Sequence, residues 1–99
     1  MSMPTTDRAA ATRIIDGLIA ANVSLLHVYD GEEDVPVKTT AEAWDAINAV
    51  DDSFLHVFDP ATGTGWLRFV LGNSPEEVLA DHTVDLSHVI DPIIDSWNE

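Results

Sequence analysis

Three segments with an alternating apolar pattern place the strongest restriction on how this chain can fold. They are residues 23–30 (VSLLHVYD), 53–59 (SFLHVFD) and 65–71 (GWLRFVL). Alternation with a period of two is typical of β-strands, in which successive side chains point to opposite faces of a sheet. Residues 60–64 contain a glycine and join the second and third segments, which predicts a hairpin. We therefore expect a largely antiparallel sheet.

A helical pattern comes before the first strand. Residues 5–22 carry apolar side chains at the spacing of one helical face, and either Thr5 or Thr6 is suited to cap the start. Asn22 tolerates the left-handed conformation in which many helices end. Gly17 weakens this helix by about 1 kcal/mol relative to alanine, so tertiary packing has to stabilise it.

A short strand and a second helix are expected between the first two long strands. Residues 35–38 form the short strand, and Pro36 restricts it to an edge of the sheet or to an irregular course. Thr39 is expected to begin the helix, because Glu42 lies three residues later and completes a capping box.

The last third of the chain leaves one choice open. Ser74 and Glu77 have the spacing of a capping box, which favours a short helix, but residues 76–84 are equally compatible with a fifth strand. Residues 86–97 have helical spacing, and within them we expect Pro92 to produce a kink or to start a new helical turn.

These elements predict one α+β domain over residues 1–99. The chain has the length of one domain, and its expected order is αββαββ(β or α)α, with a mostly antiparallel sheet of four to five strands packed on helices. The segment SLLHVYD matches SFLHVFD at an offset of 29 residues, so that His27 aligns with His56. This match has two interpretations, a duplicated αββ unit or two strands drawn from the same small set of residue types.

The strand alternation divides the sheet into two different faces. One face is purely apolar, including Leu26 and Val28 from the first strand, and is expected to pack on the helices. The other face is mixed, and its members are Leu25, His27, Tyr29, Phe54, His56, Phe58, Trp66 and Arg68. Three explanations fit such a face, namely cover by the C-terminal helix, an interface with another copy or protein, and a small-molecule pocket.

The charge of the chain is its most unusual property. There are 18 acidic residues against 4 basic ones, which gives a net charge of −14. A set of acidic side chains in predicted turns and ends is the candidate partner-binding surface: Glu32, Glu33, Asp34, Asp51, Asp52, Glu76, Glu77, Asp81 and Asp85. Such carboxylates can imitate nucleic-acid phosphates and steer the protein onto a basic groove. The alternative is that the acids only provide solubility, or adaptation to high salt.

Composition also excludes several classes of function. With four cationic side chains the chain is not expected to bind nucleic acid directly, and with no cysteine it has no disulfide, thiolate site or cysteine nucleophile. It contains neither an apolar run of membrane-spanning length nor an evident signal peptide, so we expect a cytoplasmic protein. No G-x-S-x-G setting and no phosphate-binding glycine loop occur, so an enzyme is not expected.

Two groups of histidines have a possible chemical role. His27 and His56 occupy matching positions and are expected to approach each other across the sheet, as a packed pair rather than as a metal or acid–base pair, because we expect no carboxylate on their face. Asp81, His82, Asp85 and His88 resemble a metal-binding cluster, since three of them would line one side of a continuous helix. No metal and no cofactor is predicted, and a metal-dependent hydrolase remains the third functional class.

Residues 14–95 resemble a group of short, uncharacterised acidic proteins of phages and mobile elements. The matching motifs are Asp30-Gly31-Glu32-Glu33, Val37-Lys38, Asp51-Asp52, Gly65-Trp66, Gly72-Asn73 and Asp81-His82-Thr83. The chain departs from the group at Asp34-Val35-Pro36, where the group has a compact strand start that contains an aromatic residue. The resemblance implies a phage or mobile-element setting, in which small acidic proteins often inhibit host defence as anti-CRISPR proteins or DNA mimics.

Charge and resemblance together predict a non-enzymatic inhibitor. The expected partner is a basic, nucleic-acid-handling host protein such as a CRISPR effector, contacted through the acidic side chains. The alternative is an immunity, antitoxin or chaperone-like module that self-associates, as a homodimer, through the mixed face of the sheet.

Overall fold

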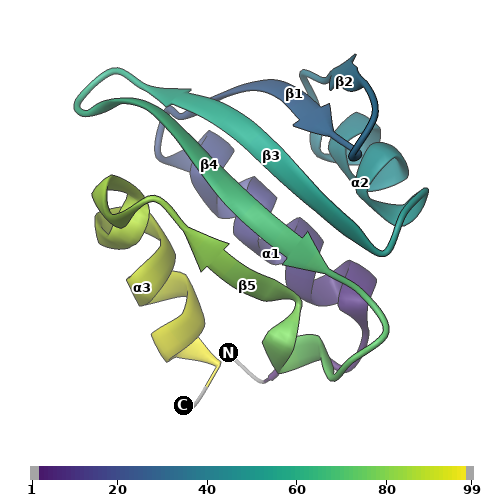
Figure 1. Cartoon of the computed structure of the whole chain (residues 1–99). Helices are drawn as coiled ribbons and strands as arrows, with labels where there is room; N and C mark the ends of the chain where they lie inside the picture. Colours follow the sequence, from purple (N-terminus) through teal and green to yellow (C-terminus); the bar gives the residue numbers. More distant parts are fainter. Residues whose placement is uncertain (1–2, 98–99) are drawn as a thin grey trace.

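The computed structural model describes residues 3–97, which form an α+β fold (Figure 1). The elements are α1 (Asp7–Ala20), β1 (Ser24–Tyr29), β2 (Asp34–Pro36), α2 (Thr40–Asn48), β3 (Asp52–Asp59), β4 (Gly63–Val70), a 3₁₀ turn η1 (Pro75–Glu77), β5 (Leu79–His82), a 3₁₀ turn η2 (Val84–Leu86) and α3 (Ser87–Ser96). This order is the expected one, with the fifth strand chosen over a further helix.

The five strands form a single antiparallel sheet in the order β2-β1-β3-β4-β5. The predicted β3–β4 hairpin is present along the full length of both strands, from Asp52 opposite Val70 to Asp59 opposite Gly63. β2 lies at the edge, where the missing N–H of Pro36 costs no hydrogen bond within the sheet. Each helix among residues 3–97 is too short or too polar to cross a bilayer.

The helices pack against one face of the sheet; in Figure 1, α1 lies behind the strands and α3 lies beside β5. The core between them is formed by the buried side chains of α1, α2 and α3 and the inward-facing side chains of the strands. It includes Ile14, Ile15 and Leu18 of α1, Trp44 and Ile47 of α2, Ile90 of α3, Leu55 and Val57 of β3, and Leu67 and Phe69 of β4. The expected apolar face of the sheet is therefore confirmed for β3 and β4.

The first strand departs from strict alternation. Leu25 pairs with Val57 and His27 pairs with His56, so Leu26 is an extra residue without a partner, which is a β-bulge. The environments predicted for Leu25 and Leu26 are therefore reversed: Leu25, expected on the mixed face, is buried in the core (8% exposed), and Leu26, expected in the core, is 40% exposed. The bulge returns Val28 to the buried face, as predicted.

The capping signals in the sequence predicted some of the helix ends correctly and others incorrectly. Thr6 caps α1 through the N–H of Ala9, and Asn22 has the expected positive φ of 67°. Thr39 and Glu42 form the predicted capping box of α2. The capping box predicted at Ser74 is wrong, because η1 is a single 3₁₀ turn in which no side-chain cap forms.

The C-terminal helix also differs from expectation. α3 continues through Pro92, so the prediction of a new helical turn at that residue is wrong. α3 packs beside α1, where Ile93 occupies the space above Gly17, and Leu86 approaches the backbone of Gly65 on the inner side of β4. The helix therefore covers the face of the sheet that α1 and α2 also cover, and not the mixed face.

Gly17 provides a test of the α1–α3 contact. A Cβ added at Gly17 would overlap the terminal methyl of Ile93, so Gly17→Ala is expected to lower the free energy of unfolding despite its better helix propensity. In an Ile93→Val background, which removes that methyl, the same substitution is expected to stabilise by up to about 1 kcal/mol. Urea unfolding of wild type, the two single variants and the double variant measures this sign reversal, and additive effects would contradict the contact.

Candidate protein-binding face

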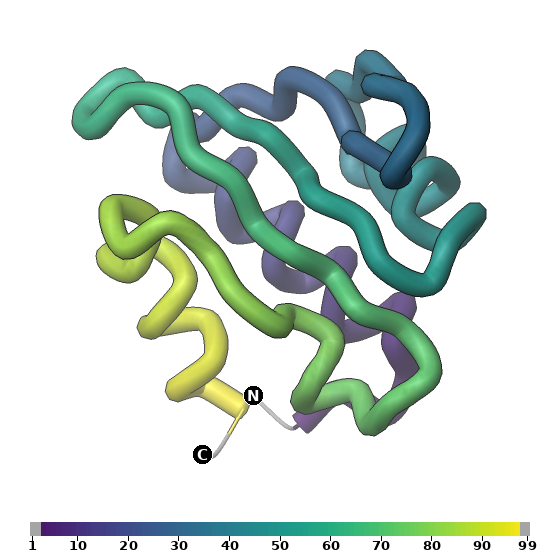
Figure 2. The backbone as a smooth tube through the Cα atoms, in the orientation of Figure 1, coloured from purple at the N-terminus to yellow at the C-terminus, as the bar shows by residue number. Residues whose placement is uncertain are grey.

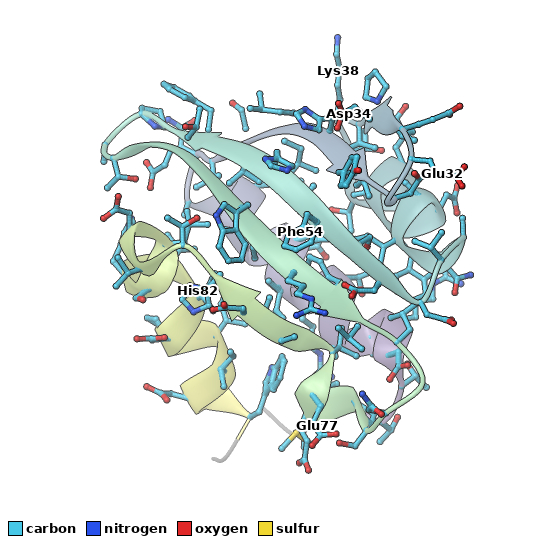
Figure 3. The ribbon with its side chains drawn as sticks, viewed as in Figure 1. Glu32, Asp34, Lys38, Phe54, Glu77 and His82 are labelled. Carbon is cyan, nitrogen blue, oxygen red and sulfur yellow. The ribbon has the colours of Figure 1, made fainter. Side chains whose placement is uncertain are left out.

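The face of the sheet opposite the helices carries the mixed side chains predicted from the alternation. Phe54 lies near the centre of this face in Figure 3, on the side away from α1. We call it the open face and define it by His27 and Tyr29 of β1, Phe54, His56 and Phe58 of β3, and Trp66 and Arg68 of β4. Phe58 is 42% and Tyr29 38% exposed, and the other members are half-buried by one another. None of the described helices covers this face.

The aromatic rings of the open face contact each other in defined geometries. Phe54 and Trp66 make an edge-to-face contact with ring centroids 5.6 Å apart. The imidazoles of His27 and His56 stack with centroids 4.5 Å apart and an interplanar angle of 22°. These cross-strand contacts are the sheet's equivalent of a packed core and hold the rings in place although solvent reaches them.

Arg68 is the cation of the open face and is held above one of these rings. Its guanidinium carbon lies 5.9 Å from the centroid of Phe54. Nε donates a hydrogen bond to Asp52 Oδ1 at 3.0 Å, and Nη2 donates to Oδ2 at 2.6 Å. This two-bond contact lowers the pKa of Asp52 and raises that of Arg68, since each charge stabilises the other.

The histidine pair has a carboxylate beside it, which the sequence argument did not expect. Asp34 begins β2 and places Oδ1 3.3 Å from His27 Nε2. The pKa of His56 is lowered, first because burial disfavours the charged ring and then because His27 lies close, while Asp34 acts in the opposite direction. The register of β1 and β2 pairs Asp34 with Tyr29 and so places this acid on the same face as His27, which no local sequence pattern indicated.

Most of the predicted acidic residues lie at one end of the sheet. β1 and β4 end there, and β3 and β5 begin there. The β1–β2 turn, the α2–β3 turn and the β4–β5 connection are spread along this end, from the upper right to the lower edge of Figure 2. We call the acidic residues of these segments the acidic end: Asp30, Glu32, Glu33, Asp34, Asp51, Asp52, Glu76 and Glu77. Asp81 instead lies within β5, and Asp85 follows the opposite end of that strand, so the predicted set is not one cluster.

The turn at the start of the acidic end is fixed by its own carboxylate. Asp30 Oδ1 accepts hydrogen bonds from the N–H groups of Glu32 and Glu33 at 2.9 and 2.8 Å, and the Asp30 N–H donates to the Glu33 carbonyl. These bonds lower the pKa of Asp30 and keep it charged. The side chains of Glu32 and Asp34 project at the periphery of the molecule, as does Glu77 near the other side of the same end (Figure 3).

The metal-like cluster predicted around residues 81–88 is not assembled. Asp81 and His82 lie in β5, Asp85 in η2 and His88 in α3, so the continuous helix on which the cluster depended does not exist. Within residues 3–97, no three His, Asp or Glu side chains converge as metal ligands would. His88 Nε2 instead lies 3.1 Å from Oδ2 of the buried Asp59, a contact between α3 and the β3–β4 hairpin that sequence reasoning missed.

Comparisons with protein-family models, with curated proteins and with solved structures found no match to this chain.

The histidine pair predicts a pH dependence of stability. Because the pKa of His56 is lower in the folded state than its ordinary value of 6.5, the unfolded chain binds more protons in this range. Stability is therefore expected to be complete above pH 6.5 and to fall as the pH drops from there toward the folded-state pKa. Thermal unfolding of wild type and His56→Phe between about pH 8 and pH 5 measures the difference, which should be smaller in the variant.

Phe58→Leu is the matched control for this experiment, because it removes a ring from the same face without removing a titratable group. The difference in stability between Phe58→Leu and wild type should be the same at every pH. If the stabilities of wild type and His56→Phe change with pH in parallel, the assigned role of His56 is contradicted.

Proposed function

We propose that this chain is a non-enzymatic binding protein whose acidic end docks on a basic, nucleic-acid-handling protein and blocks its nucleic-acid site. The observation that carries the proposal is the collection of eight carboxylates, from three segments distant in sequence, at one end of the sheet. The folded-state bonds of Asp30 and Asp52 lower the pKa of both groups and so favour their charged forms. Negative charges spread along one end of the sheet are complementary in sign to a groove that binds a phosphate backbone.

The setting of this activity follows from the same argument and from the resemblance to acidic proteins of phages and mobile elements. A host defence nuclease, such as a CRISPR effector, presents a positively charged channel for its nucleic acids. An acidic protein that occupies the channel would compete with them without any covalent chemistry. We propose the cytoplasm as the place where the two meet.

Charge-neutralised variants test the proposal. Glu32→Gln, Glu33→Gln and Glu77→Gln together remove three charges from the acidic end, while Asp85→Asn, Asp91→Asn and Asp95→Asn remove three charges from exposed positions of η2 and α3. Binding to a purified CRISPR effector is measured as a function of salt. The acidic-end variant is expected to lose about tenfold or more in affinity and to show a shallower salt dependence, whereas the control variant should bind nearly as wild type does.

If both variants lose the same affinity for the effector, only net charge matters, and the proposal that the acidic end is the docking surface is contradicted. A wild-type affinity that does not change with salt would remove the charge-based proposal altogether. Thermal unfolding of each variant is measured alongside, because removing like charges is expected to stabilise the fold rather than to weaken it.

A self-associating module is the second candidate, and the exposed aromatic rings of the open face favour it. Sedimentation equilibrium of wild type and Phe58→Asp tests this function. If two copies meet through the open face, wild type should form dimers and the variant should not, because the new carboxylate would be buried against aromatic rings. Monomers in both cases would exclude this candidate at the concentration used.

A further inference from the structure

We infer that the open face is a binding surface for arginine side chains of a basic partner, with Trp66 and Asp81 as the principal contacts. The inference rests on the proposed function, since it names the chemistry by which the basic partner is recognised beside the acidic end. It goes further in assigning the specificity to aromatic rings paired with carboxylates rather than to charge alone.

The molecule contains its own example of this recognition. The guanidinium of Arg68 lies over the ring of Phe54 and is held there by two hydrogen bonds from Arg68 to Asp52. A flat, weakly hydrated guanidinium can contact a ring face and a carboxylate at the same time, whereas a lysine ammonium provides only a point charge. One combination of ring and carboxylate on this face is thus shown to accommodate a guanidinium.

A second ring and a second carboxylate are diagonal neighbours at Trp66 and Asp81. Asp81 lies directly opposite Arg68 across β4 and β5, so it shares the open face and is the diagonal neighbour of Trp66. Asp81 is exposed, and its charge contributes to raising the pKa of Arg68. The ring of Trp66 is held by its edge-to-face contact with Phe54, and the backbone N–H of Trp66 donates a hydrogen bond to Thr83 Oγ1. Tryptophan has the strongest cation–π attraction among the aromatic side chains.

The surroundings of this pair are electrostatically complementary to a basic partner. The open face borders three carboxylates, those of Asp34, Asp52 and Asp81, against one arginine, and the arginine is already neutralised by Asp52. Beyond Arg68 the face continues into a hollow lined by Glu76 and Glu77 over the apolar side chains of Val70 and Leu79. A second copy of this chain also has a net charge of −14, so its approach to this face is opposed by charge repulsion.

The rings are also held in place before a partner arrives, which lowers the entropic cost of binding. The stacked histidines and the Phe54–Trp66 pair are fixed by contacts between neighbouring strands rather than by loops. Tryptophan and tyrosine on rigid elements are typical of the residues that contribute most to protein–protein affinity.

Two peptides of equal charge test the inference. Fluorescein-labelled octaarginine and octalysine are titrated with the full chain at the same low salt concentration, and affinity is measured by anisotropy. Wild type is expected to bind octaarginine about threefold or more tightly than octalysine, because a cation–π contact adds to the charge attraction. Trp66→Leu should lose this preference while it retains its affinity for octalysine.

The acidic-end variant with Glu32→Gln, Glu33→Gln and Glu77→Gln is the matched control. Its affinity for both peptides should fall by the same factor. The indole N–H signals of the wild-type protein provide a measurement that does not depend on the stability of Trp66→Leu. The signal of Trp66 should shift with octaarginine, while Trp44 and Trp97, which are buried, act as internal references.

Equal binding of the two peptides by wild type, or shifts confined to the acidic end, would overturn the inference and leave the proposed function standing. Failure of wild type to bind either peptide would instead contradict the charge attraction on which the proposed function depends. Self-association through the open face would appear as a concentration-dependent shift of the Trp66 signal without peptide, and it would also overturn the inference.

Discussion

The helices cover only one face of the five-stranded sheet, and most properties of this protein follow from that constraint. Strands buried on one side must alternate apolar and other side chains, and β3 and β4 do so along their full length. The buried half of each strand forms the core with α1, α2 and α3. The side chains on the opposite face do not pack against helices. They include aromatic rings, histidines and an arginine that contact one another across the strands.

High negative charge is tolerated because of where the fold places it. The acidic side chains lie mainly in turns and at strand ends, where water surrounds them, while the inward-facing positions of β3 and β4 are apolar apart from Ser53 and Asp59. The antiparallel order then brings three separate acidic segments to one end of the sheet, which concentrates the charge there. Repulsion among these groups acts against folding, and the apolar core and the hairpin hydrogen bonds have to overcome it.

The open face and the acidic end are adjacent, and together they are suited to one kind of partner. Carboxylates attract a basic surface over a distance of about 10 Å, but this attraction discriminates little between arginine and lysine. Aromatic rings act only at contact and favour a guanidinium. We propose that the first feature brings a partner close and that the second selects the side chains it presents.

Sequence reasoning succeeded where a signal was local and failed where two elements had to meet. The capping box of Thr39 and Glu42, the left-handed Asn22 and the β3–β4 hairpin depend on residues close in the chain, and each is present. The approach of His27 to His56 was also predictable, because it follows from the matching segments. The bulge at Leu26, the missing cap at Ser74 and the contact of Asp34 with His27 depend on register and packing, which no local pattern contains.

The amino-acid sequence by itself determined the α+β class, the strand alternation and the strongly negative charge, because these depend on residue types and their spacing. Only the tertiary structure decided which face of the sheet remained open. α3 packs beside α1, where Ile93 occupies the space above Gly17, and so it lies on the helix-covered side of the sheet. That packing choice leaves the aromatic rings exposed, and the antiparallel connections gather the acids beside them, since both depend on contacts between residues far apart in the chain.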